Sequence, residues 1–196
     1  MNNENFDADM IKRQKLINEA LADVETIVDA LGNPIDGGIK EGIAVFHALG
    51  INTTQSCEGH EDWGTGAPYI DVESKDSGAL LKQIEELPKQ EDLDKENPER
   101  DAILHKILVK NLEERKKLIP LLDEFYRNRQ TLFEDRLFIR GMANGWSRLE
   151  SQGAEFQEVE TNEVNKKEAL NRFQREMQEF IAFAKNKFLS EGPDRK

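Results

Sequence analysis

Apolar residues recur at helical spacing along most of the chain. This periodicity predicts amphipathic helices over Met10–Leu31 and Ile39–Leu49, a short one over Ser77–Leu87 with Ser77 as its cap, and long ones over Pro98–Arg129 and Val164–Phe188. Pro120 predicts a kink that could divide the fourth helix into two. The apolar positions expected to face inward in the last two helices are Ile103, Ile107, Leu108, Leu112, Leu118, Leu122, Phe125, Val164, Leu170, Phe173, Met177, Phe180, Ala184 and Phe188.

Four short segments have the character of strands. Ile51–Cys57 is rich in β-branched residues, and Ala67–Glu73 alternates polar and apolar side chains with a period of two, as in a strand with one buried face. Leu137–Met142 and Trp146–Glu150 flank Asn144-Gly145, a strong signal for a hairpin turn. The chain is therefore predicted to be an α+β protein, with a small sheet of about four strands packed against long helices.

Composition agrees with a helix-dominated single domain spanning residues 1–196. The chain has 196 residues, of which 37% are hydrophobic and 34% charged, a mixture typical of amphipathic helices with solvated faces. The densest run of charge, Lys89–Arg100, is predicted to be a solvated loop between helices.

Charge and cysteine content exclude several classes of protein. A formal net charge of −12 disfavours nonspecific binding to nucleic acid, because the chain repels the phosphate backbone. Cys57 is the single cysteine, so no intramolecular disulfide can form. The sequence has no basic, apolar secretory leader and no apolar run of roughly 20 residues, so we expect a cytoplasmic protein that does not cross a membrane.

Candidate chemistry is concentrated in Thr53–Gly66, at the end of a predicted strand. This acidic, glycine-rich segment contains Cys57, one of the three histidines (His60), three carboxylates and four hydroxyl groups. Loops that a rigid scaffold positions commonly carry function. A ligand-binding or catalytic pocket centred on Cys57 and His60 is therefore the first functional hypothesis.

One interpretation makes Cys57 a nucleophile. Gly59 would turn the chain so that His60 removes the thiol proton, with Glu58 as a proton carrier. The nearby carboxylates of Glu58, Glu61 and Asp62 disfavour a thiolate, because they repel its negative charge. A lone cysteine is also commonly an inert, buried, small apolar residue.

A second interpretation makes Cys57 and His60 a Cys-x-x-His metal pair, for which zinc is the candidate ion. The sequence contains no second Cys/His pair to complete a structural site. The remaining ligands would come from among His47, His105, Glu58, Glu61 and Asp62. For His47 and His105, a partly buried, hydrogen-bonded structural histidine is the alternative.

A third interpretation is the binding of a small polar molecule. Backbone N–H groups of the glycine-rich turn would meet an anion, and Trp63 or Tyr69 would cover a flat ring. Arg140 and Arg148 would face the same pocket if the hairpin joins the sheet of Cys57, or would be ordinary surface charges paired with Glu150 or Asp135. The candidate ligand-binding residues are Ser56, Gly59, Trp63, Tyr69, Arg140 and Arg148.

The competing hypothesis is a scaffold protein without a site. In that case the aromatic stripe Phe173, Phe180 and Phe188 either packs in the core or associates between chains, and a homo-oligomer is expected from the second arrangement.

Thr53–His60 carries two resemblances. The pattern Thr-Thr-x-Ser-Cys-x-Gly-His, after a helix that ends in Leu-Gly-Ile, resembles a signature of uncharacterised bacterial and phage proteins. The segment is also similar to the Thr-Thr-Ser-Ser-Cys-Ser-Gly-Arg motif of the wybutosine-synthesising tRNA methyltransferase family, which uses S-adenosylmethionine. It departs from that motif at Gln55, Glu58 and His60, and replaces a cationic end by an acidic one. The resemblance implies a strand end that lines a pocket, and methyl transfer is not carried over. The matching positions are Thr53, Thr54, Ser56, Cys57 and Gly59.

Overall fold

A four-stranded antiparallel sheet lies at the centre of the computed structural model, which describes residues 3–29, 31–62, 65–88 and 97–190. The strands are β1 (Thr53–Cys57), β2 (Tyr69–Val72), β3 (Leu137–Gly141) and β4 (Ser147–Ser151), in the order β1-β2-β4-β3. The predicted hairpin is confirmed, and it joins the sheet through the pairing of β4 with β2. Asn144 and Gly145 both adopt the positive φ that this turn requires, 55° and 77°.

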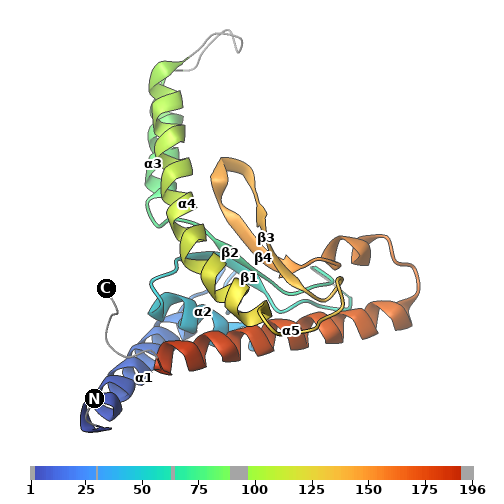
Figure 1. Cartoon of the computed structure of the whole chain (residues 1–196). Helices are drawn as coiled ribbons and strands as arrows, with labels where there is room; N and C mark the ends of the chain where they lie inside the picture. Colours follow the sequence, from blue (N-terminus) through green and yellow to red (C-terminus); the bar gives the residue numbers. More distant parts are fainter. Residues whose placement is uncertain (1–2, 30, 63–64, 89–96, 191–196) are drawn as a thin grey trace.

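In the described residues, five α-helices lie beside and below the sheet (Figure 1). Figure 1 shows α3 beside the first half of α4, with both projecting from the rest of the molecule, while α5 runs along the base and meets α1 at its far end. The predicted helix-dominated α+β class is therefore confirmed. The helices are α1 (Asn3–Glu25), α2 (Lys40–Ala48), α3 (Ser77–Glu86), α4 (Pro98–Tyr126) and α5 (Glu163–Ser190), with short 3-10 turns at Ala143–Gly145 and Ala154–Glu158.

The core lies between one face of the sheet and α2, α4 and α5. Phe46 and Phe180 are fully buried and meet edge to face, with ring centroids 6.3 Å apart. Ile70 and Leu149, paired across β2 and β4, are also fully buried on this face. The main buried cluster comprises Val24, Ile39, Ile43, Ala44, Phe46, Ile51, Ile70, Val72, Leu118, Leu121, Phe125, Tyr126, Leu137, Leu149, Met177, Phe180 and Ile181.

The first helix is shorter at its C-terminal end than predicted. It ends at Glu25, and Val28 forms an isolated β-bridge with Pro34. The Asp29 carboxylate accepts the backbone N–H groups of Leu31 and Asn33, both at 2.8 Å, and so stabilises a turn in place of another helical turn. Val28 and Leu31 are consequently exposed, contrary to the prediction from periodicity.

Three predictions for the projecting helices are wrong. Ser77 does not cap α3: its hydroxyl donates to Asn111 Oδ1 at 3.0 Å and ties α3 to α4. Leu108 and Leu112 are about half exposed, because α3 covers a different side of α4. The alternative of two helices is also wrong, since α4 continues through Pro120. Of the predicted charged loop, residues 89–96 lie outside the described residues, and Pro98–Arg100 form the first turn of α4.

The predicted stripe of α5 is buried within the chain itself. Phe173, Phe180 and Phe188 are at most 8% exposed, whereas Val164, predicted to face inward, is 65% exposed at the start of the helix. The aromatic stripe thus packs in the core and is not a free surface for a partner. In the part of the chain that the structure describes, no helix has the length and hydropathy needed to cross a bilayer.

Phe180→Glu should therefore abolish stable folding. It places a charge in a fully buried position without a partner, which costs more than about 4 kcal/mol of unfolding free energy. Val164→Glu, on the same helix but exposed, should stay within about 0.5 kcal/mol of the wild type. Urea unfolding followed by circular dichroism measures both. Equal stability of the two variants would contradict this placement of α5.

Candidate functional site

The face of the sheet opposite the core carries most of the candidate functional side chains. In an antiparallel ladder, directly paired residues point to the same face and successive residues alternate. Cys57 pairs with Tyr69, and Tyr69 with Glu150, so these three form one row across the sheet. We call this surface the polar face; its residues are Cys57, Tyr69, Asp71, Phe138, Arg140, Arg148 and Glu150.

Asp71 and Arg148 form the central ion pair of the polar face. Arg148 Nε and Nη2 donate to the two carboxylate oxygens of Asp71, at 2.7 and 2.9 Å. The Arg148 guanidinium also lies 3.7 Å from the centroid of the Tyr69 ring. Asp71 is only 1% exposed, although the alternation of β2 predicted a solvent-facing polar residue. Arg148 makes this burial possible, because it satisfies both oxygens.

Three donor side chains from two segments converge at the β1 end of this face. Asp36, Cys57 and His60 each present a ligand atom, and these atoms lie within 4.8 Å of one another. His60 Nε2 is 3.2 Å from Asp36 Oδ2, and the side chains of His60 and Asp36 are 14% and 24% exposed. Cys57 is 8% exposed. Within the described residues, no other group of three or more such side chains meets this geometry.

The chain turn at Gly59 directs a backbone donor at the sulfur. Gly59 has φ of +81°, and its N–H donates to Cys57 Sγ at 3.3 Å. The next turn is closed by His60 N–H, which donates to the Thr65 carbonyl at 2.9 Å. A Cβ at position 59 would lie 2.8 Å from the Leu170 side chain and 2.9 Å from the backbone at Ala67. The sequence pattern Cys-x-Gly-His thus has a specific local geometry.

Helix α5 holds the two segments of this cluster together. Gln174 Nε2 donates to the carbonyls of Glu58 and Gly59, at 3.1 and 3.2 Å, and Gln178 Nε2 donates to the Gly38 carbonyl at 2.8 Å. Asp36 is then fixed by Glu58 N–H, which donates to Asp36 Oδ2 at 3.1 Å. Asp36 is the residue that sequence reasoning missed, because a lone Asp before Gly37-Gly38 reads as an ordinary turn.

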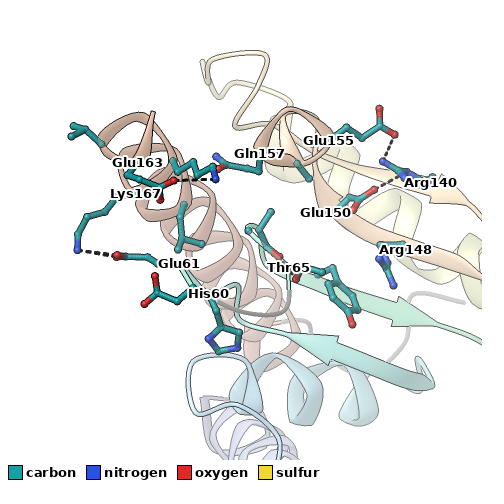
Figure 2. A pocket seen from close by; sticks show the side chains of 18 residues that line it. His60, Glu61, Thr65, Arg140, Arg148, Glu150, Glu155, Gln157, Glu163 and Lys167 are labelled. Atoms are coloured by element: carbon teal, nitrogen blue, oxygen red, sulfur yellow. Dashed lines mark hydrogen bonds and ion pairs between the residues drawn. The ribbon is translucent and has the colours of Figure 1, made fainter. Parts of the chain in front are cut away.

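Two cavities open beside this cluster. The first, about 720 Å³, lies between the polar face, the loop after β1 and the start of α5; His60, Tyr69, Arg140, Arg148 and Glu150 are among its lining residues. Figure 2 shows Glu150 next to Arg140 on one side of this cavity, and it shows His60 on the opposite side. The second, about 870 Å³, lies along β1 and is lined by Asp36, Ser56 and Cys57, with Tyr69 shared between the two.

The predicted metal and proton-carrier partners lie elsewhere. Glu58 accepts the Gly38 N–H at 2.6 Å and lines neither of the two cavities. His47 Nε2 is 2.9 Å from Thr53 Oγ1, and burial lowers the pKa of His47, as for a structural histidine. His105 is exposed on α4, so the partly buried alternative is wrong for it.

Of the remaining predicted residues, some share the face of Cys57 and others do not. Arg140 and Arg148 do share the face of Cys57, as expected if the hairpin joins the sheet. Arg140 pairs with Glu150 and Glu155, at 2.7 and 2.5 Å. Asp135, one of the suggested surface partners, instead binds Arg172. Glu61 forms an ion pair with Lys167, and Asp62 is exposed. Trp63 lies outside the described residues.

Comparison with known proteins does not assign the chain to a family. No family model matches the chain, and neither a curated protein nor a solved structure matches it. The fold and the site therefore define the class directly: a helix-dominated α+β protein with a mixed oxygen, sulfur and nitrogen donor group at the edge of a polar sheet face.

Gly59→Ala should destabilise the protein by about 1–3 kcal/mol, because it combines a left-handed backbone with a buried steric clash. Gly37→Ala is the matched control: a Cβ there meets nothing within 4 Å. Chemical denaturation of both variants measures the difference. A Gly59→Ala variant as stable as Gly37→Ala would argue against the described turn.

Glu150→Gln should change the dependence of stability on pH. Burial raises the pKa of Glu150, opposed by Arg140 and Arg148. A carboxyl whose folded pKa exceeds its unfolded value stabilises the fold at low pH and loses that contribution as pH rises through the folded pKa. Glutamine does not titrate, so the stability of the variant relative to wild type should increase from pH 4 to pH 7. Denaturant midpoints at several pH values test this.

Glu113→Gln is the control, since it removes an exposed carboxylate that pairs with Lys116 and does not act on Glu150. A relative stability of Glu150→Gln that is flat or falls with pH would contradict the prediction.

Proposed function

We propose that this protein binds one zinc ion through Asp36, Cys57 and His60, and binds a small polar molecule in the adjoining cavity of about 720 Å³. The single observation that carries the proposal is the convergence of these three donor atoms within 4.8 Å. Carboxylate, thiolate and imidazole are all zinc ligands, and two donors each about 2.0 Å from zinc at a tetrahedral angle lie roughly 3.3 Å apart. The His60–Asp36 distance of 3.2 Å fits this value.

The surroundings of the cluster support the same proposal. The Gly59 N–H donated to Cys57 Sγ is the kind of outer hydrogen bond that orients a metal-ligating thiolate. Glu58 N–H does the same for Asp36 Oδ2. Three protein ligands leave one coordination position, which is typical of catalytic and not of structural zinc sites. A zinc ion in such a position supplies Lewis-acid chemistry or an activated water.

A cytoplasmic location stays a prediction, and its reducing conditions would keep a metal-ligating Cys57 from being oxidised. The competing scaffold hypothesis rested on Phe173, Phe180 and Phe188, which are buried in the core of the chain itself. A homo-oligomer stays a prediction, and the described residues identify no surface through which copies of the chain would associate.

The test is zinc binding by purified protein. Isothermal titration and elemental analysis should find one zinc per chain, and Asp36→Ala, Cys57→Ser and His60→Ala should each abolish high-affinity binding. His47→Ala is the control and should retain zinc binding, because His47 lies on α2 and bonds Thr53 instead of the donor group. Cobalt substitution should give a thiolate-to-metal absorption band that Cys57→Ser loses.

Failure of the wild type to bind zinc or cobalt would refute the metal site. Metal-free protein whose Cys57 is alkylated rapidly, and slowly in His60→Ala, would favour the nucleophile hypothesis instead. Each variant should keep its thermal midpoint within a few degrees, so that loss of binding is not loss of folding.

A further inference from the structure

Glu150 has a buried carboxyl oxygen without a hydrogen bond. The residue is 6% exposed, and Oε1 has no hydrogen-bond partner in the described structure. Arg140 Nε lies 2.7 Å from this oxygen, which makes an ion pair, but its N–H is not aligned for a hydrogen bond. Arg140 is also drawn toward Glu155, as Figure 2 shows.

An unsatisfied oxygen of this kind is costly. A buried carboxylate oxygen without a hydrogen bond costs roughly 1–3 kcal/mol, of which the ion pair with Arg140 offsets a part, and native structures contain few such groups. The other carboxylate of the polar face, Asp71, is fully satisfied by Arg148. Since Glu150 lines the cavity of about 720 Å³, a bound molecule is in position to supply the missing donor.

The cationic side chains around this cavity are all paired with carboxylates. Lys167 pairs with Glu61 at 2.9 Å, Lys166 with Glu163 at 3.3 Å, and Arg140 with Glu155 at 2.5 Å. Arg148 is held by Asp71 below the cavity wall. The lining has five carboxylates against four cationic side chains, and each of those cations is paired, so the cavity disfavours an anion. An uncharged hydroxyl can donate to Glu150 without breaking any of these ion pairs.

The need for a hydrogen-bond donor at Glu150 Oε1, together with the side chains around it, narrows the class of ligand further. A hydroxyl group donates one hydrogen bond and accepts others, so it can meet Glu150 Oε1 and a guanidinium N–H together. Burial raises the pKa of Tyr69, which keeps its phenol a neutral donor on the same wall. Ala67, Val164 and Leu170 supply apolar surface for the carbon skeleton of a ring. The volume lies within the usual range for small-molecule sites, about 300–1,000 Å³.

We propose that this cavity binds an uncharged molecule with vicinal hydroxyl groups on a ring, and that one hydroxyl donates to Glu150 Oε1. A simple glycoside and the ribose of a nucleoside share this chemistry. The proposal rests on the small-molecule part of the proposed function, and it is independent of the metal.

Saturation-transfer NMR with millimolar probes tests the proposal. The probes are methyl glucoside, adenosine, 2′-deoxyadenosine and adenosine monophosphate. We expect methyl glucoside or adenosine to bind. We expect 2′-deoxyadenosine to bind more weakly than adenosine, and adenosine monophosphate to bind no more tightly than adenosine. Binding of methyl glucoside alone identifies a glycoside site, and binding of adenosine alone a nucleoside site.

Glu150→Leu replaces the carboxylate acceptor by an apolar side chain of similar shape. Arg140 keeps its ion pair with Glu155 in this variant, and binding should weaken by roughly tenfold or more. Glu113→Gln removes an exposed carboxylate that pairs with Lys116 on α4 and does not line this cavity, so it should bind as the wild type does.

Three results would overturn the inference. Neither methyl glucoside nor adenosine binds the wild type, adenosine monophosphate binds about tenfold or more tightly than adenosine, or folded Glu150→Leu binds the neutral probe as well as the wild type does. Zinc binding measured on the same samples separates this inference from the metal proposal. Glu150→Leu should keep zinc, and Cys57→Ser should keep the neutral probe.

Discussion

The ion pair between Asp71 and Arg148 is the interaction on which the arrangement of the site depends. It joins β2 to β4, and so connects two parts of the chain that are 77 residues apart in sequence. Breaking a buried pair by removing one partner typically costs about 3–5 kcal/mol, because the other charge is left uncompensated. The pair also places Tyr69 beneath the Arg148 guanidinium. The pair thus gives the polar face a defined geometry.

Helix α5 contributes the second constraint, and it acts on both faces of the sheet. Its apolar side, with Met177 and Phe180 fully buried, packs against the core face. Its polar side uses Gln174 and Gln178 to hold the backbone after β1 and before α2. The donors of the candidate metal site come from these two segments. Their convergence is therefore a consequence of helix packing and not of local sequence.

This division explains what could be predicted from sequence. The hairpin, the strands and the α5 stripe are local patterns, and periodicity together with Asn144-Gly145 identified them. Cys57 and His60 were identified because the Cys-x-Gly-His turn is also local. Asp36 was missed because its partners are more than 20 residues away, and Asp71 was expected in solvent because nothing nearby in sequence indicates Arg148.

Glu150 was missed as a site residue for a related reason. The sequence allowed it only as a surface partner of Arg140 or Arg148, and that ion pair to Arg140 does form. Its burial depends on β4 lying between two strands, with Tyr69 opposite on one side and Phe138 on the other. Leu108 was wrongly predicted to be buried, because α3 covers a different side of α4.

The row Cys57–Tyr69–Glu150 relates the two proposed sites physically. Adjacent strands are about 4.8 Å apart, so Cys57 and Glu150 are separated by roughly 10 Å across two strand spacings. Tyr69 stands between them and lines both cavities. A ring that donates to Glu150 would extend over Tyr69 toward His60, which lines the same cavity and belongs to the donor group. A small molecule of ordinary length can therefore reach from the one site to the other, and neither site needs the chain to rearrange.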